Sequence, residues 1–340
     1  MRFGTVPVRD AEGAISAHSV RRDGVAIRKG AAISAADVLA LAAAGIREIV
    51  AARLHPGDVG EDEAAGRLAE AVAGGGVRAE RPWTGRSNLF ATSAGVLRLD
   101  RDAIDRINAA DEAVTVATLP DLKPVVDGEM VATVKIIPYA VPGAVLREAL
   151  SAAADASVVA VAPYRVRRVG MVSTVLPGLK DSTIAKTEEA FRDRLRPTGA
   201  ELIAAATCGH DASALAAALS AQVENGCELV AVFGASAIAD RHDVIPSAIE
   251  GAGGRVDHFG MPVDPGNLLL VGRVGNVPVL GAPGCARSPK ENGFDWVLHR
   301  LLADIPVTRR DIARLGVGGL LMEIVSRPQP RGGGEPAEDA

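Results

Sequence analysis

Aromatic residues are scarce in this chain, making up only 3% of its 340 residues. Its core must therefore be built from small aliphatic side chains, which suits helices packed on a sheet. Cysteine is also scarce, because the chain has three widely spaced cysteines and no Cys-x-x-Cys pair. This spacing argues against a zinc ribbon or a disulfide framework, and it indicates a reducing, cytoplasmic compartment.

The sequence has no run of basic residues, and its net charge is −5. It therefore has no electrostatic footprint of a nucleic-acid binder. No stretch reaches the roughly 18 uninterrupted apolar residues of a membrane span, and Met1–Gly13 has no apolar core of signal-peptide length. We expect neither nucleic acid nor membrane as a partner. The length favours two domains, and 48% hydrophobic with 23% charged residues is typical of a soluble globular chain.

Residues 1–165 are predicted to form an α+β region. Ser34 can cap a helix over residues 35–44, which Gly45 ends before a strand over residues 46–52. Apolar residues at helical spacing, and β-branched residues in short runs, predict further elements in this region. These are helices over 61–73 and 103–110 and strands over 112–119 and 129–137.

Residues 166–325 alternate regularly between apolar strands and amphipathic helices, which predicts a three-layer αβα domain. The expected strands are 169–174, 201–206, 229–233, 256–263, 268–273 and 277–280, and the expected helices are 183–195, 211–224, 244–252 and 291–302. Residues 326–340 are rich in Pro and Gly, a composition that predicts a flexible tail.

The loops that follow the strands are the expected place for a ligand, because ligands of such sheets bind beyond the carboxyl ends of the strands. The first loop, 175–182, offers Lys180, Asp181 and Ser182 beside a helix start, where backbone amides can hold an oxyanion. The simpler alternative is that Asp181 or Ser182 only caps the helix.

The second loop, 234–243, directly follows the most hydrophobic strand. Gly234 would let a ligand approach the backbone, and Ser236 could bond a phosphate. Asp240 and Asp243 could share a magnesium ion, which prefers oxygen ligands and often bridges protein to phosphate. Asp243 could equally serve as the cap of the helix that begins at residue 244.

The third and fourth loops are rich in proline and glycine, which make rigid turns with exposed amides. Such turns suit flat or phosphorylated small molecules. The candidate binding residues are Pro265 and Gly266 in the third loop and Pro283, Gly284, Ser288 and Lys290 in the fourth.

Taken in order, the four loops resemble the molybdopterin-binding domain of the molybdenum-cofactor biosynthesis proteins, over about residues 166–305. The matches are Ser173-Thr174 to the family's Ser-Thr-Gly-Asp-Glu-Leu, Gly234 and Ser236 to its Gly-Gly-x-Ser loop, Asp243-Val244-Ile245-Pro246 to its Asp before an apolar pair and Pro, and Pro265-Gly266 and Pro283-Gly284 to its Pro-Gly turns. Two segments depart from the pattern. Val175-Leu176-Pro177 replaces Gly-Asp-Glu, so one family carboxylate is missing, and Asp181 is no more than a candidate substitute. Cys285-Ala286-Arg287 is inserted in the fourth loop.

The resemblance implies binding of molybdopterin or its adenylate, with Asp243 and Asp240 holding Mg²⁺ as catalytic and metal-binding residues. Ser173, Thr174 and the loop residues above would contact the cofactor, and Lys180, Lys290 or Arg287 would orient its phosphate. The reaction would be adenylyl transfer or molybdate insertion. Segments 83–88 and 134–138 resemble insertase-like proteins in which a nucleotidyltransferase domain follows. The implied partners are therefore a nucleotidyltransferase or a molybdoenzyme, and the family commonly forms homo-oligomers.

Two other functions stay open at this stage. The missing Gly-Asp-Glu motif favours a non-catalytic carrier that hands molybdopterin to a partner enzyme. A nucleotide-processing enzyme of the competence-damage type shares the same domain, but the insertase-like amino-terminal half disfavours it.

Overall fold

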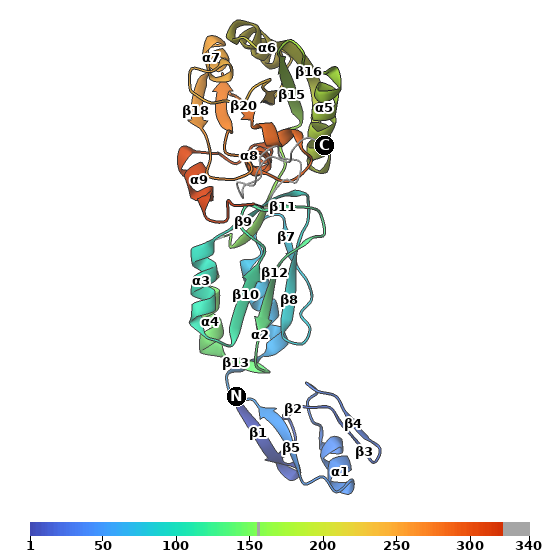
Figure 1. Ribbon diagram of the computed structural model, residues 1–340. Helices are drawn as coiled ribbons and strands as arrows, with labels where there is room; N and C mark the ends of the chain where they lie inside the picture. Colours follow the sequence, from blue (N-terminus) through green and yellow to red (C-terminus); the bar gives the residue numbers. More distant parts are fainter. Residues whose placement is uncertain (155–156, 322–340) are drawn as a thin grey trace, which may run out of the picture. The chain divides into compact units, whose positions relative to one another are not determined.

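The computed structural model describes residues 1–154 and 157–321, and the chain forms two compact units (Figure 1). The first unit consists of Met1–Ser93 and Leu97–Val161, and the second consists of Ala94–Val96 and the residues from Ala162 onward. Both contain helices and strands, so the α/β class expected from the sequence is confirmed. The tail predicted over residues 326–340 lies outside the described residues.

The first unit begins with a small α+β segment. Its sheet has the order β1-β5-β2, beside a β3-β4 hairpin and one helix. The bounds are β1 (Arg2–Pro7), β2 (Ile15–Ser16), β3 (Val20–Arg22), β4 (Val25–Ile27), α1 (Ala35–Ala43) and β5 (Glu48–Arg53). Ser34 caps α1 in a capping box with Asp37, and Gly45, with φ of +71°, follows the helix.

The remainder of the first unit is built on an antiparallel sheet of order β10-β12-β8-β7. Its bounds are β6 (Asp58–Gly60), α2 (Glu61–Val72), β7 (Val77–Ala79), β8 (Arg86–Ala91), β9 (Gly95–Leu99), α3 (Arg101–Ala110), β10 (Val114–Thr118), β11 (Pro124–Val125), β12 (Met130–Ile136), β13 (Ala140–Pro142), α4 (Gly143–Ala153) and β14 (Val159–Pro163). Leu68, Leu89 and Ile136 are fully buried where α2 packs on this sheet.

The second unit contains a six-stranded sheet of order β16-β15-β17-β20-β19-β18. Its bounds are β15 (Arg168–Val175), α5 (Asp181–Leu195), β16 (Glu201–Gly209), α6 (Ala212–Glu224), β17 (Leu229–Phe233), α7 (Val244–Gly251), β18 (Arg255–Phe259), β19 (Leu270–Val274), β20 (Val277–Ala282), α8 (Gly293–Leu302) and α9 (Arg309–Ala313). The strand predicted to run to Val263 ends at Phe259, because Gly260 turns the backbone with φ of +79°.

Helices cover both faces of this sheet (Figure 1). On one face, Leu219 of α6 and Ile249 of α7 share a buried cluster with Val172 of β15. On the other face, Phe191 of α5 and Phe294 of α8 pack against Phe233 of β17, with ring centroids 5.5 and 6.0 Å from that of Phe233. The second unit is therefore a three-layer domain in which Phe191, Phe233 and Phe294 pack together on one face of the sheet.

Candidate functional site

Four parallel strands of the second unit end at the same edge of the sheet. Ser173 of β15 lies in register with Phe233 of β17, which lies in register with Ala282 of β20. Strand β16 also runs parallel to β15, with Gly209 opposite Val175. The loops after these strands, which include Gly234 and Pro283, therefore meet at one edge, called here the carboxyl edge.

A continuous series of hydrogen bonds joins the end of β15 to the loops after β16 and β17. The Ala235 N–H donates to Thr174 Oγ1 over 2.8 Å, and Thr174 Oγ1 lies 2.8 Å from Nδ1 of His210. On the other side of the ring, His210 Nε2 lies 2.9 Å from Ser236 Oγ. Thr174 is fully buried, whereas Ser236 is exposed. The hydrogen-bonded series is thus buried at Thr174 and exposed to solvent at Ser236.

Arg287 connects the fourth loop to the second. Its guanidinium donates to the Gly234 carbonyl and to Thr187 Oγ1, both over 2.8 Å, and lies 5.8 Å from the ring centroid of Phe233. Burial lowers the pKa of this guanidinium from its ordinary value. The segment that contains Arg287 therefore holds the start of the second loop in place.

The two acidic residues of the second loop make hydrogen bonds within the loop. Asp243 caps α7: its Oδ1 accepts from the Val244 N–H at 2.7 Å, and its Oδ2 accepts from the Ala239 N–H at 3.0 Å. Asp240 Oδ1 accepts from the His242 backbone N–H at 2.8 Å, and hydrogen bonds from His242 lower the pKa of Asp240. Among residues 1–154 and 157–321, no group of three or more His, Cys, Asp or Glu side chains is arranged to hold a metal ion.

The first loop places its predicted residues at the start of α5. Lys180 is the N-cap residue and makes no side-chain cap, and Asp181 and Ser182 are exposed in the first turn. Ser173 is 2% exposed, and its hydroxyl has no hydrogen-bond partner within the described part of the chain. It is the one predicted site residue whose buried polar group remains unsatisfied in this part of the chain.

Pro265 and Gly266 of the third loop are both buried, and they support the start of α8. The Pro265 carbonyl accepts from the Gly293 N–H over 2.8 Å. A Cβ at Gly266, where φ is +140°, would lie 2.8 Å from the Gly293 backbone, so only glycine fits there. This close packing explains the Pro-Gly pair without a ligand, and a ligand role for it stays a prediction.

The fourth loop is held from α5. Arg194 donates to the backbone carbonyls of Ser288 and Lys290 and forms a 2.6 Å ion pair with Asp295 of α8. Both charged side chains are nearly buried, at 7% and 11% exposure. Pro283 is buried, whereas Gly284 and the Lys290 side chain are exposed.

In the first unit, segments 83–88 and 134–138 lie side by side, because β8 pairs with β12 and Arg86 lies opposite Lys135. Lys135 donates to the Thr84 carbonyl and lies 3.6 Å from a Glu61 carboxylate oxygen. The Gly85 N–H donates to Asp62 over 2.6 Å. Burial raises the pKa of Glu61, although Lys135 partly opposes the shift.

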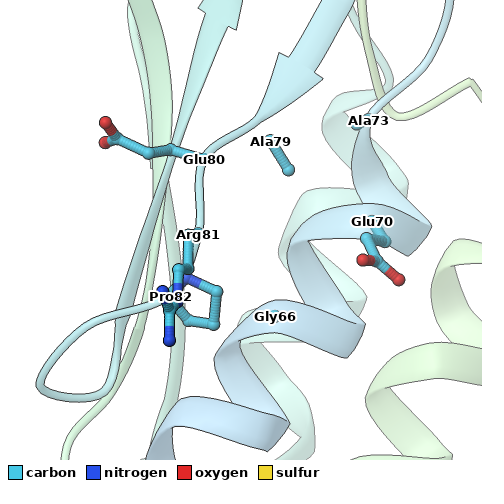
Figure 2. Close-up of a pocket in the computed structure, with 7 residues that line it drawn as sticks. All are labelled: Gly66, Glu70, Ala73, Ala79, Glu80, Arg81 and Pro82. Carbon is cyan, nitrogen blue, oxygen red and sulfur yellow. The ribbon is translucent and has the colours of Figure 1, made fainter.

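The first unit also has a surface pocket of about 310 Å³ between α2 and the segment after β7 (Figure 2). Gly66 allows Pro82 to approach α2, since a Cβ there would lie 3.1 Å from the proline ring. The other lining residues are Glu70, Ala73, Ala79, Glu80 and Arg81. None of the residues predicted from the sequence as site residues lines this pocket.

His210, which lies between Thr174 and Ser236 at the carboxyl edge, was not among the predicted site residues. His210 had a usable signal, because it follows an apolar strand, as the predicted site residues of the other loops do. Arg287 was expected to orient a ligand phosphate, whereas its guanidinium donates to the Gly234 carbonyl and to Thr187 Oγ1.

Comparison with known proteins gives one family-model match and several structural likenesses. Residues 5–53 match a family described as "Domain of unknown function (DUF8806)". No curated protein matches the chain.

Among solved structures, a molybdopterin biosynthesis MoeA protein from Pyrococcus horikosii is 15% identical, with 92% of this chain and 75% of that chain covered and a TM-score of 0.28. The molybdopterin biosynthesis enzyme MoaB from Thermus thermophilus is 17% identical, with 41% and 98% covered and a TM-score of 0.29. The Mog protein from Mycobacterium ulcerans is 13% identical, with 42% and 100% covered and a TM-score of 0.27. Assignment of a function therefore rests on this chain's own residues.

No helix within residues 1–154 and 157–321 is long and apolar enough to cross a membrane.

Proposed function

We propose that the carboxyl edge of the second unit binds a phosphate-bearing pterin, molybdopterin or its adenylate, and that the protein acts in molybdenum-cofactor biosynthesis. The hydrogen-bonded chain from Thr174 through His210 to Ser236 carries the proposal. It brings together two loops at the positions where the sequence motifs match the molybdopterin-binding domain. The register of β15, β17 and β20 adds the fourth loop to the same edge.

The charge around this edge suits a phosphate group. Lys180 and Lys290 are exposed on the first and fourth loops, and within the described residues neither forms an ion pair. Their ammonium groups can offset phosphate charge, and the free amides in the first turn of α5 favour an anion. Gly284, which is exposed and has open space at its Cβ position, leaves room for a flat ring at the end of β20.

Whether the bound pterin reacts depends on the acidic residues. In the catalytic form of the proposal, Asp243 and Asp240 hold Mg²⁺ and support adenylyl transfer or molybdate insertion, with a nucleotidyltransferase or a molybdoenzyme as the partner. The alternative is a carrier that hands the pterin to such a partner. A specific observation favours the carrier: both carboxylate oxygens of Asp243 already accept backbone amides.

Equilibrium binding of molybdopterin and of its adenylate, followed by pterin fluorescence with and without Mg²⁺, tests the proposal. We expect Ser236→Ala to weaken binding about tenfold, as the loss of a hydrogen bond to a charged group typically does. Ser151→Ala, an exposed serine of α4 in the other unit, is the matched control and should bind like the wild type. Equal binding by both variants, or no binding by the wild type, would refute the proposal.

A further inference from the structure

The hydroxyl of Thr174 constrains how protons are placed along the hydrogen-bonded chain. Its oxygen accepts from the Ala235 N–H, and its only other partner among the described residues is Nδ1 of His210. Thr174 is fully buried, so its hydroxyl proton cannot reach water. A buried donor without an acceptor is strongly disfavoured. The Thr174 hydroxyl must therefore donate to Nδ1 of His210.

This donation determines where the protons lie on His210 and Ser236. A neutral imidazole carries one proton, so when Nδ1 accepts, Nε2 carries the N–H. Nε2 then donates to Ser236 Oγ, which lies 2.9 Å away. A base-activated serine would need the opposite arrangement, with Nε2 unprotonated and ready to accept the serine proton. Ser236 is therefore held as a hydrogen-bond donor whose own proton points away from His210.

We infer that His210 is a positioning residue that turns the Ser236 hydroxyl toward an oxyanion, such as a ligand phosphate; this inference rests on the proposed function and deepens it. Two neighbouring groups support the choice of ligand. The backbone N–H groups of Ser236 and Ala237 donate to no acceptor in the described part of the chain. Three donors on one exposed loop thus lack a protein acceptor, and an oxyanion supplies several acceptor oxygens at once.

The acidic side chains of the same loop do not oppose this assignment. Asp243 directs both of its oxygens to the amides of Ala239 and Val244, and Asp240 accepts from His242. Both oxygens of Asp243 and Oδ1 of Asp240 thus accept from donors of their own segment. The donors at Ser236 and Ala237 are therefore left for a ligand.

The tautomer can be measured directly on the full-length protein labelled with ¹⁵N-histidine. The signals of His210 are identified by their loss in His210→Gln. We expect an unprotonated Nδ1 and a protonated Nε2 at pH 8 in the wild type and in Thr174→Ser, which keeps the hydroxyl. Thr174→Val, which removes it at nearly constant volume, should give a mixture of tautomers. A protonated Nδ1 in the wild type, or an unchanged tautomer in Thr174→Val, would overturn the inference.

Inorganic phosphate, titrated by calorimetry, tests the ligand class. Glutamine can accept from Thr174 and donate to Ser236, so His210→Gln should bind phosphate within about threefold of the wild type. His210→Leu and Ser236→Ala should bind about tenfold more weakly, which is the expected loss of one hydrogen bond to a charged group. Ser151→Ala should match the wild type. Equal affinity of His210→Leu and the wild type, or no phosphate binding at all, would contradict the oxyanion assignment.

The two proposals fail in different ways. If the pterin binds but His210 carries its proton on Nδ1, the positioning role is wrong and the proposed function stands. If the tautomer and phosphate results hold but neither pterin binds, the proposed function is wrong and the oxyanion site stands.

Discussion

Replacing Arg287 by methionine removes the guanidinium that ties the fourth loop to the second, while keeping most of the apolar stem. The variant loses the hydrogen bonds to the Gly234 carbonyl and to Thr187 Oγ1 and the contact with the Phe233 ring. Hydrogen bonds to a charged group contribute about 1.5–3 kcal/mol each, and a cation over an aromatic ring about 0.5–1 kcal/mol. Burial of the charge offsets part of this gain, as the lowered pKa of Arg287 indicates.

We therefore expect the free energy of unfolding of the second unit to fall by about 2–4 kcal/mol in Arg287→Met. The chain has two tryptophans, Trp83 in the first unit and the half-buried Trp296 in α8. A Trp83→Phe background leaves Trp296 as the only tryptophan, so its fluorescence during urea unfolding reports on the second unit. The melting temperature should fall by about 5–15 °C, since each kcal/mol shifts it by about 2–4 °C in a domain of this size.

Two variants check the reasoning. Arg287→Lys keeps the charge but not the fork of donors, so it should be destabilised by about half as much. Arg310→Met, at an exposed arginine of α9, is the matched control and should stay within about 0.5 kcal/mol of the wild type. If Arg287→Met is no less stable than this control, Arg287 does not hold the two loops together.

Three further outcomes follow from the second unit. Asp295→Asn should cost about 3 kcal/mol of unfolding free energy in the Trp296 assay, because it leaves the buried Arg194 charge unpaired while keeping the capping oxygen of α8; a loss below about 1 kcal/mol would contradict this. Burial lowers the pKa of His299, so the unfolded chain takes up a proton that the folded state resists, and stability should fall as the pH drops below about 6.5. His299→Gln should flatten that slope between pH 7 and 5. Asp243→Asn should fold and bind the pterin within about twofold of the wild type, because the carboxylate acts as a cap; loss of Mg²⁺-dependent binding or turnover in this variant would instead assign the metal role to Asp243.

The elements of the second unit could be predicted because their signals are local. Helix α6 has an Asp211 cap and a Leu215–Leu219 stripe, and β17 is a run of five apolar residues. The first unit was harder to predict. Strand β8 carries Arg, Ser and Asn and exists through its pairing with distant β12. Helix α4 begins after Pro142 with no side-chain cap, so no start signal marks it.

Strand direction allowed only one property of the site to be predicted, namely which loops meet at one edge of the sheet. Parallel strands bring their following loops to one edge whatever the loops contain, and the ends of β17 and β20 lie in register at Phe233 and Ala282. His210 was missed because the predicted strand stopped at Ala206, three residues short of the true end at Gly209. The contacts of Arg287 could not be predicted, because its partners lie 53 and 100 residues away in sequence.

Because Asp243 caps α7, magnesium binding by this carboxylate would also affect the start of that helix. A magnesium ion bound by this carboxylate would compete with the Ala239 and Val244 amides for the same two oxygens. Metal binding would then leave those amides without partners and weaken the start of α7. A phosphate on the Ser236 side meets no such competition, because its donors have no other acceptor among the described residues. In the proposed site, the free donors at Ser236 and Ala237 favour an anion, whereas a metal ion bound by Asp243 would share the carboxylate that caps α7.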